Sequence, residues 1–161
     1  PAASKRVRMS SEELPTRQTS TGKSFMRRRE QVKRELVQQW LDKAEEDFGV
    51  AKYLASKGTP YLSAIGFHAQ QAAEKYLKAV LVHHQTEFSK THNIGELLDL
   101  IVLVDASLAE SLRDTTALNP YGVDIRYPAD LPKMTQEDSK EAMDLVLKLR
   151  ESVRGVLKEY I

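Results

Sequence analysis

The sequence predicts an all-α protein: an antiparallel, up-and-down four-helix bundle with one short extra helix. Apolar residues recur at gaps of three and four along several long stretches, which is the spacing of an amphipathic helix. Signals for helix starts and stops separate these stretches. No stretch alternates apolar and polar residues as a half-buried strand does. We therefore expect residues 26–161 to form one helical bundle.

The first expected helix begins near Met26 and ends at Gly58. Its buried stripe alternates gaps of four and three, with Trp40 and Leu54 widening it: Val37, Leu41, Ala44, Phe48, Ala51 and Ala55. Gly58 is a typical helix stop, Thr59 is a candidate cap for the next helix, and Pro60 suits its first turn. So short a connection predicts that the first two helices are antiparallel neighbours.

The stretch from Tyr61 to His84 is expected to be the central helix of the bundle. Its small residues leave little bulk between Tyr61, Ile65, Tyr76 and Val80: they are Ala69, Ala72, Ala73 and Ala79. Another helix can approach closely where the side chains are this small.

Capping signals predict three further helices. Asn93 with Glu96 starts a helix over residues 94–104, and Ser107 with Glu110 starts a shorter one that ends near Leu118. Residues 119–132 hold three prolines and a glycine and are expected to form an irregular loop. Thr135 with Asp138 caps the last helix, whose buried stripe is Ala142, Val146, Leu149, Val153, Val156 and Tyr160.

Residues 1–25 are expected to be a flexible basic tail. They are rich in Ser, Thr and basic residues, and they have too few large apolar side chains to offset the cost of ordering. An organelle transit peptide is the alternative, although Glu12, Glu13 and Pro15 count against it. Over all 161 residues, 24 Lys and Arg face 23 Asp and Glu, so overall charge does not indicate a nucleic-acid partner.

The absence of cysteine excludes disulfides, thiol catalysis and thiolate metal sites, and it suits a reducing compartment. No apolar run is long enough to span a bilayer. We therefore expect a cytoplasmic protein without a membrane partner.

A polar face on the expected central helix carries the first candidate site residues. At 100° per residue, four side chains fall within about 80° of one another: His68, Gln71, Lys75 and Lys78. Phe67 and Leu81 flank them on the same general side. A ligand site or a subunit interface tolerates such a mixture of polar and apolar groups.

The proline-rich loop adds three more candidates: Asp124, Arg126 and Tyr127. They lie on a segment expected to be extended, because Tyr127 precedes Pro128. Loops held by a rigid scaffold are common places for binding residues.

Each candidate also has a purely structural explanation. Lys78 follows Glu74 by four residues, which is the spacing of an ordinary surface ion pair on a helix. Lys75 can extend past an apolar neighbour, and His68 is better explained as a packed, hydrogen-bonded histidine than as a catalytic base. Arg126 is equally suited to a phosphate and to a bond that holds its loop to Asp124 or Glu74.

The remaining histidines give no sign of a metal. His92, next to a helix start, is better explained as a structural contact than as a ligand. His83 and His84 point about 100° apart on a helix and cannot chelate from one face. We expect neither a metal nor a cofactor.

Three motifs occur in a characteristic order. They are the run Phe67 to Ala79 (FHAQQAAEKYLKA), then Thr91-His92-Asn93-Ile94 at a helix start, then Arg126-Tyr127-Pro128 before the last helix. In these motifs the chain resembles the HEPN family (higher eukaryotes and prokaryotes nucleotide-binding), in its RYP-containing branch, over about residues 30–161. The resemblance implies an antiparallel helical bundle that is usually a homodimer. It also implies a gene often found beside a minimal nucleotidyltransferase, in a toxin–antitoxin-like pair, and in some branches a metal-independent ribonuclease.

The ribonuclease branch depends on an arginine followed by a histidine after four to six residues, and this chain lacks that motif. The arginine nearest upstream of His68 is Arg34. The resemblance then implies a non-catalytic module, not an enzyme, which binds a nucleotide or another phosphate-bearing ligand through Lys75, Lys78 and Arg126.

Two alternatives remain open. The chain is an atypical metal-independent ribonuclease or toxin, with RNA as its substrate, if His68 and Arg126 meet in space. It is a helical dimer scaffold if no ligand binds at all.

Overall fold

The structure is a computed structural model that describes residues 18–122 and 133–161. In these two ranges it contains helices and no strand, so the predicted all-α class is confirmed. The long helices are α1 (Gln18–Ser56), α2 (Leu62–His83) and α5 (Gln136–Val156). Shorter elements complete the fold: α3 (Ile94–Val102), α4 (Ala106–Ser111) and the 3₁₀ segments η1 (Arg113–Tyr121) and η3 (Lys158–Tyr160).

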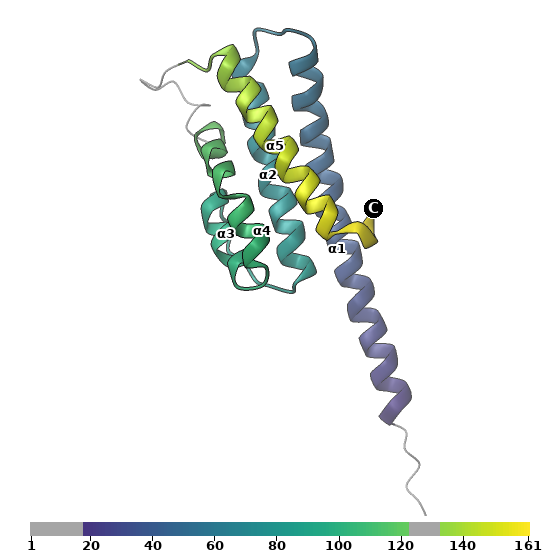
Figure 1. Cartoon of the computed structure of the whole chain (residues 1–161). Helices are drawn as coiled ribbons and strands as arrows, with labels where there is room; N and C mark the ends of the chain where they lie inside the picture. The colour runs from purple at the N-terminus through teal and green to yellow at the C-terminus, as the bar shows by residue number, and fades with distance from the viewer. Residues whose placement is uncertain (1–17, 123–132) are drawn as a thin grey trace, which may run out of the picture.

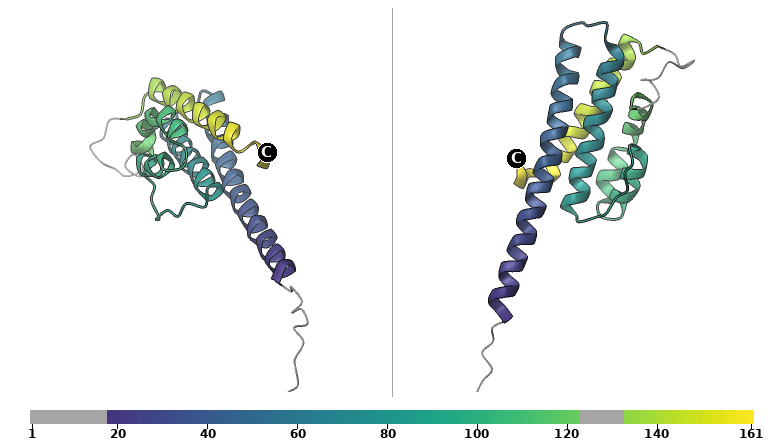
Figure 2. Two further views of the ribbon diagram at one scale, coloured as in Figure 1. Left: turned by 60° about the horizontal axis from the view of Figure 1, so that its bottom comes forward. Right: turned by 180° about the vertical axis from the view of Figure 1, so that it is seen from behind.

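The central position predicted for α2 is confirmed. Figures 1 and 2 show α1 and α2 side by side, α5 crossing them, and α3, α4 and η1 on the other side of α2. Helix α2 contacts α1, α5, α3 and η1. The four alanines singled out on it, Ala69, Ala72, Ala73 and Ala79, are all completely buried, as close helix approach requires. Tyr61, by contrast, is exposed and forms the N-cap of α2.

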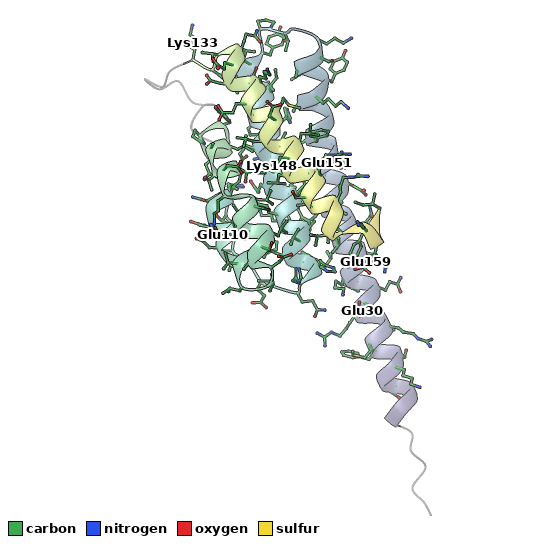
Figure 3. All side chains as sticks on the ribbon, viewed as in Figure 1. Glu30, Glu110, Lys133, Lys148, Glu151 and Glu159 are labelled. Carbon is green, nitrogen blue, oxygen red and sulfur yellow. The ribbon has the colours of Figure 1, made fainter. Side chains whose placement is uncertain are left out.

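Helix α1 begins at Gln18, ahead of the predicted start near Met26. Once packing has nucleated a helix, each further residue adds to it at little cost in free energy. Straight-chain residues such as Arg27 to Arg29 have high helix propensity and can therefore extend α1 even where they are not buried. Figure 1 shows this first half extending past the rest of the bundle, and in Figure 3 the side chain of Glu30 lies on the extended part. Residues 1–17 of the predicted tail lie outside the described residues.

The connection between α1 and α2 follows the prediction in one respect and departs from it in another. Gly58 has a φ of +60°, which favours glycine at the helix stop. Thr59 was predicted to cap α2, but its Oγ1 accepts from the Tyr61 N–H at 3.1 Å, just before the helix. It therefore stabilises the turn. The stripe on α1 is buried from Val37 to Ala51, but Ala55 is exposed in the last turn.

Local capping chemistry fixed two helix starts as predicted. The Asn93 side chain accepts from the Glu96 N–H at 3.2 Å. Thr135 and Asp138 form a reciprocal capping box, with the Asp138 N–H donating to Thr135 Oγ1 at 3.1 Å. The stripe of α5 is buried from Ala142 to Val153 and continues to Tyr160 in η3, with Val156 half-buried.

The segment after α3 differs from the prediction. The cap of α4 is Asp105, which accepts from the Leu108 N–H at 2.9 Å, and not Ser107. Both residue types are good caps, so packing selects between neighbouring candidates. The chain then continues as η1 through Asn119 and Pro120, which were predicted to lie in an irregular loop. Helix α3 ends at Val102, two residues before the predicted end at Val104, and with 9 residues it is much shorter than α2 with 22.

A polar clamp joins the three long helices. Arg150 on α5 donates from Nε and Nη2 to the two carboxylate oxygens of Glu45 on α1, at 2.9 and 3.0 Å. The Tyr76 hydroxyl on α2 donates to the same carboxylate at 2.7 Å. Burial opposes ionisation of Glu45, but the hydrogen bonds from Arg150 and Tyr76 outweigh it and hold the pKa below its ordinary value.

Glu45→Gln should therefore cost stability at neutral pH and not in strong acid. Because the folded-state pKa of Glu45 lies below 4.5, its contribution is complete above that pH and is lost as pH falls through the folded-state pKa. With a half-exposed carboxylate we expect about 0.5–1 kcal/mol, measured by urea denaturation between pH 3 and 7. Glu46→Gln, at an exposed position of the same helix, is the control. If the loss of unfolding free energy in Glu45→Gln grew as pH falls, the lowered pKa of Glu45 would be contradicted.

Within the described ranges, none of the helices combines the length and the apolar character needed to cross a bilayer.

Candidate functional site

The polar face of α2 meets α1 at Asp47, a residue that the sequence analysis did not single out. His68 Nδ1 lies 2.8 Å from Asp47 Oδ1, and the Lys75 ammonium donates to the other oxygen, Oδ2. Lys75 also donates to Gln71 Oε1 at 3.1 Å. The side chains of His68, Lys75 and Asp47 keep 28%, 19% and 16% of their exposure, so a ligand can reach them. We call Asp47, His68, Gln71 and Lys75 the Asp47 cluster.

The geometry of the Asp47 cluster orients an imidazole. When His68 donates its Nδ1–H to Asp47, the tautomer is fixed and Nε2 carries the free lone pair. This explains the histidine as a hydrogen-bonded group, which is the structural alternative that the sequence favoured. It also makes Nε2 available to accept a proton or a hydrogen bond from a ligand.

A signal for Asp47 was present in the sequence. Asp47 follows Ala44 by three residues and precedes Ala51 by four, so it lies at the edge of the buried stripe. A carboxylate at the edge of an apolar stripe is expected to have a cationic partner on the facing helix. The stripe alone cannot show which residue of α2 is that partner.

A second group of polar side chains is buried deeper. Lys78 donates to Glu74 Oε1 at 2.7 Å, and His92 Nδ1 lies 3.1 Å from Glu74 Oε2. Gln70 Nε2 donates to the His92 carbonyl at 3.0 Å. Gln70, Glu74 and Lys78 are buried, whereas the His92 side chain is largely exposed. We call these four residues the Glu74 cluster.

The ion pair of Lys78 and Glu74 was predicted as a surface pair, and burial corrects that prediction. Helix α2 is covered on this side by aromatic side chains, and the Lys78 ammonium lies 5.3 Å from the ring centroid of Trp40 and 5.7 Å from that of Phe88. The Lys78 ammonium thus forms an ion pair with one carboxylate and cation–π contacts with two aromatic rings.

The two clusters form one hydrogen-bonded chain. Gln71 Nε2 donates to Gln70 Oε1 at 2.9 Å, which connects Lys75 on one side with Glu74 on the other. All four candidates on the polar face are therefore found in one network, but Lys75 and Lys78 are each bound by a carboxylate.

The three loop candidates, Asp124, Arg126 and Tyr127, lie outside the described residues. The residues on either side of their segment are described. A Cβ on Gly122 would lie 2.9 Å from the Gln70 side chain, and one on Gly66 would lie 2.8 Å from that of Met134. The described residues on either side of the segment, Gly122 and Met134, therefore lie beside Gln70 and Gly66.

The described residues that flank the loop lie away from His68. Gly66 and Gln70 are about 40° apart on α2, and His68 is about 160° from both. Gly122 and Met134 thus lie on the side of α2 that carries Gln70, away from the imidazole.

His83 and His84 have structural contacts. Their rings pack edge to face with centroids 4.8 Å apart, and His83 Nδ1 lies 2.9 Å from the Tyr160 hydroxyl. His83 therefore helps to hold the C-terminal turn against α2.

The HEPN domain family model matches residues 37–156. The chain belongs to the HEPN family. The match includes both clusters and omits the first half of α1.

Relatives of this HEPN chain agree in sequence and fold. It is 30% identical over 132 residues to a protein of Methanocaldococcus jannaschii named "Putative toxin MJ1304", covering 76% of this chain and 86% of that protein. The crystal structure of ST0689, described as an archaeal HEPN homologue, superposes with a TM-score of 0.58 at 25% identity, covering 74% of this chain and 95% of the other. The crystal structure of TT1696 from Thermus thermophilus gives a TM-score of 0.60 at 26% identity, covering 78% and 98%.

Proposed function

We propose that this HEPN chain is a non-catalytic module that binds a nucleotide or another phosphate-bearing ligand at the Asp47 cluster. The observation that carries the proposal is that His68 and Lys75 share one carboxylate at a partly exposed edge between α1 and α2. An incoming phosphate can accept hydrogen bonds from the Lys75 ammonium and from protonated His68. Lys78 is left out of this contact set because its ammonium is buried against Glu74.

The biological setting is part of the same proposal. We place the chain in the RYP-containing branch of the family. Each chain forms a four-helix bundle of α1, α2, α5 and the short α3, and two chains form a homodimer. Its partner is a minimal nucleotidyltransferase in a toxin–antitoxin-like pair. The similarity to a protein named as a toxin supports this setting, and Arg126 is the loop residue proposed to reach the ligand.

His68→Gln and Lys75→Gln should each weaken ligand binding by about tenfold or more, because each removes a charge-assisted hydrogen bond. Titration calorimetry with a series of nucleoside mono-, di- and triphosphates measures this. Lys52→Gln, at an exposed position of α1 away from the cluster, should bind as the unaltered chain does. Unchanged affinity in both cluster variants, each folded by circular dichroism, would refute the proposed site.

The second candidate is metal-independent RNA cleavage, which the hydrogen bond between Asp47 and His68 favours, because it leaves Nε2 placed as a base. The same purified samples decide between the two functions. RNA incubated with EDTA should stay intact with the unaltered chain if the module only binds. Cleavage that disappears in His68→Gln would establish the second candidate in place of the first.

A further inference from the structure

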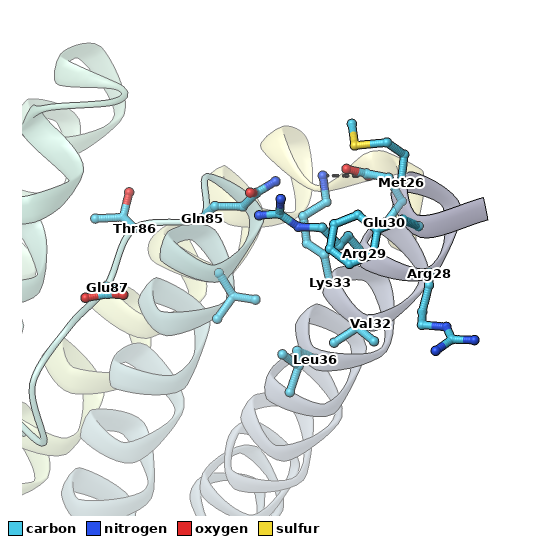
Figure 4. Close-up of a pocket in the computed structure, with 12 residues that line it drawn as sticks. Met26, Arg28, Arg29, Glu30, Val32, Lys33, Leu36, Gln85, Thr86 and Glu87 are labelled. Atoms are coloured by element: carbon cyan, nitrogen blue, oxygen red, sulfur yellow. Dashed lines mark ion pairs between the residues drawn. The ribbon is translucent and has the colours of Figure 1, made fainter. Parts of the chain in front are cut away.

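The first half of α1 forms one wall of a groove that neither cluster uses. The groove has a volume of about 550 Å³, and its other wall is the end of α2 with the segment that follows it. Figure 4 shows Val32 and Leu36 on α1 facing this space, with Gln85, Thr86 and Glu87 across from them. All the residues of α1 that line the groove precede residue 37, where the family match begins. The α1 wall of the groove therefore lies outside the residues that the family model matches, and the other wall lies within them.

The apolar side chains on the α1 wall of the groove are spaced like those of a helix-binding surface. Phe25, Val32 and Leu36 fall within about 40° on one face of α1, and all three are exposed, Phe25 by 61% and Leu36 by 42%. Apolar side chains so exposed, on a regular stripe, are typical of surfaces that accept the apolar face of another helix.

The rim of the groove is positively charged. Lys33 is neutralised by Glu30, 2.9 Å away. Arg28 and Arg29 remain, and in the described part of the chain neither has an ion pair; Arg29 lies over the Phe25 ring at 5.9 Å. Among the residues that line the groove, three basic side chains (Arg28, Arg29 and Lys33) face two acidic ones (Glu30 and Glu87), a net charge of +1.

The two unpaired arginines indicate which kind of molecule binds in the groove. A second copy of the chain would bring the two unpaired arginines against the same pair in its partner, which opposes self-association here. A partner helix with carboxylates beside its apolar face would instead pair with the two arginines, whose guanidinium groups match carboxylates in bidentate geometry. A flat membrane would not enter the space between α1 and residues 85–87.

We propose that this groove docks an acidic amphipathic helix of another protein, with its apolar side chains on Phe25, Val32 and Leu36 and its carboxylates on Arg28 and Arg29.

The test uses the full chain and a synthetic probe. The probe is a fluorescent helical peptide with leucines at gaps of four and three and glutamates on both flanks, and its counterpart carries lysine in place of every glutamate. Fluorescence anisotropy should show that the acidic peptide binds at least tenfold more tightly than the basic one, and that salt weakens its binding. Leu36→Glu and the double variant Arg28→Glu/Arg29→Glu should each weaken it tenfold or more. Tyr53→Glu, an exposed apolar position near the other end of α1, should leave it unchanged.

Three results would overturn the proposal. The first is equal affinity for the two peptides, or no binding of either. The second is a dimer in sedimentation that Leu36→Glu dissociates, because a second copy would then occupy the groove. The third is binding to vesicles of anionic lipid that Leu36→Glu abolishes while the acidic peptide does not bind. Each variant replaces exposed side chains, so circular dichroism should confirm that the chain still folds.

Discussion

Glu74→Leu is expected to lower the free energy of unfolding by about 3–5 kcal/mol, the usual cost of removing one partner of a buried ion pair. Lys78 would lose its carboxylate partner in a site where its side chain is only 7% exposed. The rings of Trp40 and Phe88 would attract the ammonium, but they offer it no acceptor oxygen. Urea denaturation measures the loss as a lower midpoint at unchanged slope.

A second substitution shows whether the unpaired charge is the cause. Glu74→Leu combined with Lys78→Met removes both charges and should recover most of the lost stability. Glu110→Leu, which removes an exposed carboxylate 3.6 Å from Arg113, should change the stability by no more than about 0.5 kcal/mol. A double variant as unstable as Glu74→Leu alone would show that the stranded charge of Lys78 is not what destabilises the protein.

Ala73→Leu is expected to destabilise the protein by about 1–3 kcal/mol, because α2 is enclosed by its neighbours and Ala73 has no exposed surface. The added side chain must push a neighbouring helix away or adopt a strained rotamer. Thermal and urea denaturation should agree on the loss.

Ala55→Leu is the matched control for overpacking. Ala55 was predicted to lie on the buried stripe of α1, but it is exposed, so the larger side chain meets solvent and the change should stay within about 0.5 kcal/mol. Equal effects at Ala73 and Ala55 would contradict the close packing around α2.

The helices were predictable because their signals are local. The buried stripes of α1 and α5 follow from spacings of three and four residues, and the caps at Asn93 and Thr135 from residues three apart. Prediction failed where neighbouring residues offer similar local choices. Asp105 and Ser107 are both good caps, and packing selects Asp105.

The candidate site was predictable only in part. Spacing on one helix identified His68, Gln71, Lys75 and Lys78 as a polar face, and all four belong to the hydrogen-bonded network. Spacing could not supply Asp47, which is 21 residues from His68 and belongs to another helix. Nor could it show that the two lysines face different carboxylates.

The sequence by itself determined that this chain forms amphipathic helices, where most of them begin, and that α2 is the central one, since periodicity and capping act over three or four residues. Only the tertiary structure decided that Glu74 and Lys78 are a buried pair, that His68 meets Asp47, and that Gly122 lies beside Gln70. These outcomes depend on how each helix is rotated against its neighbours, and that rotation is set by the packing of side chains far apart in the chain.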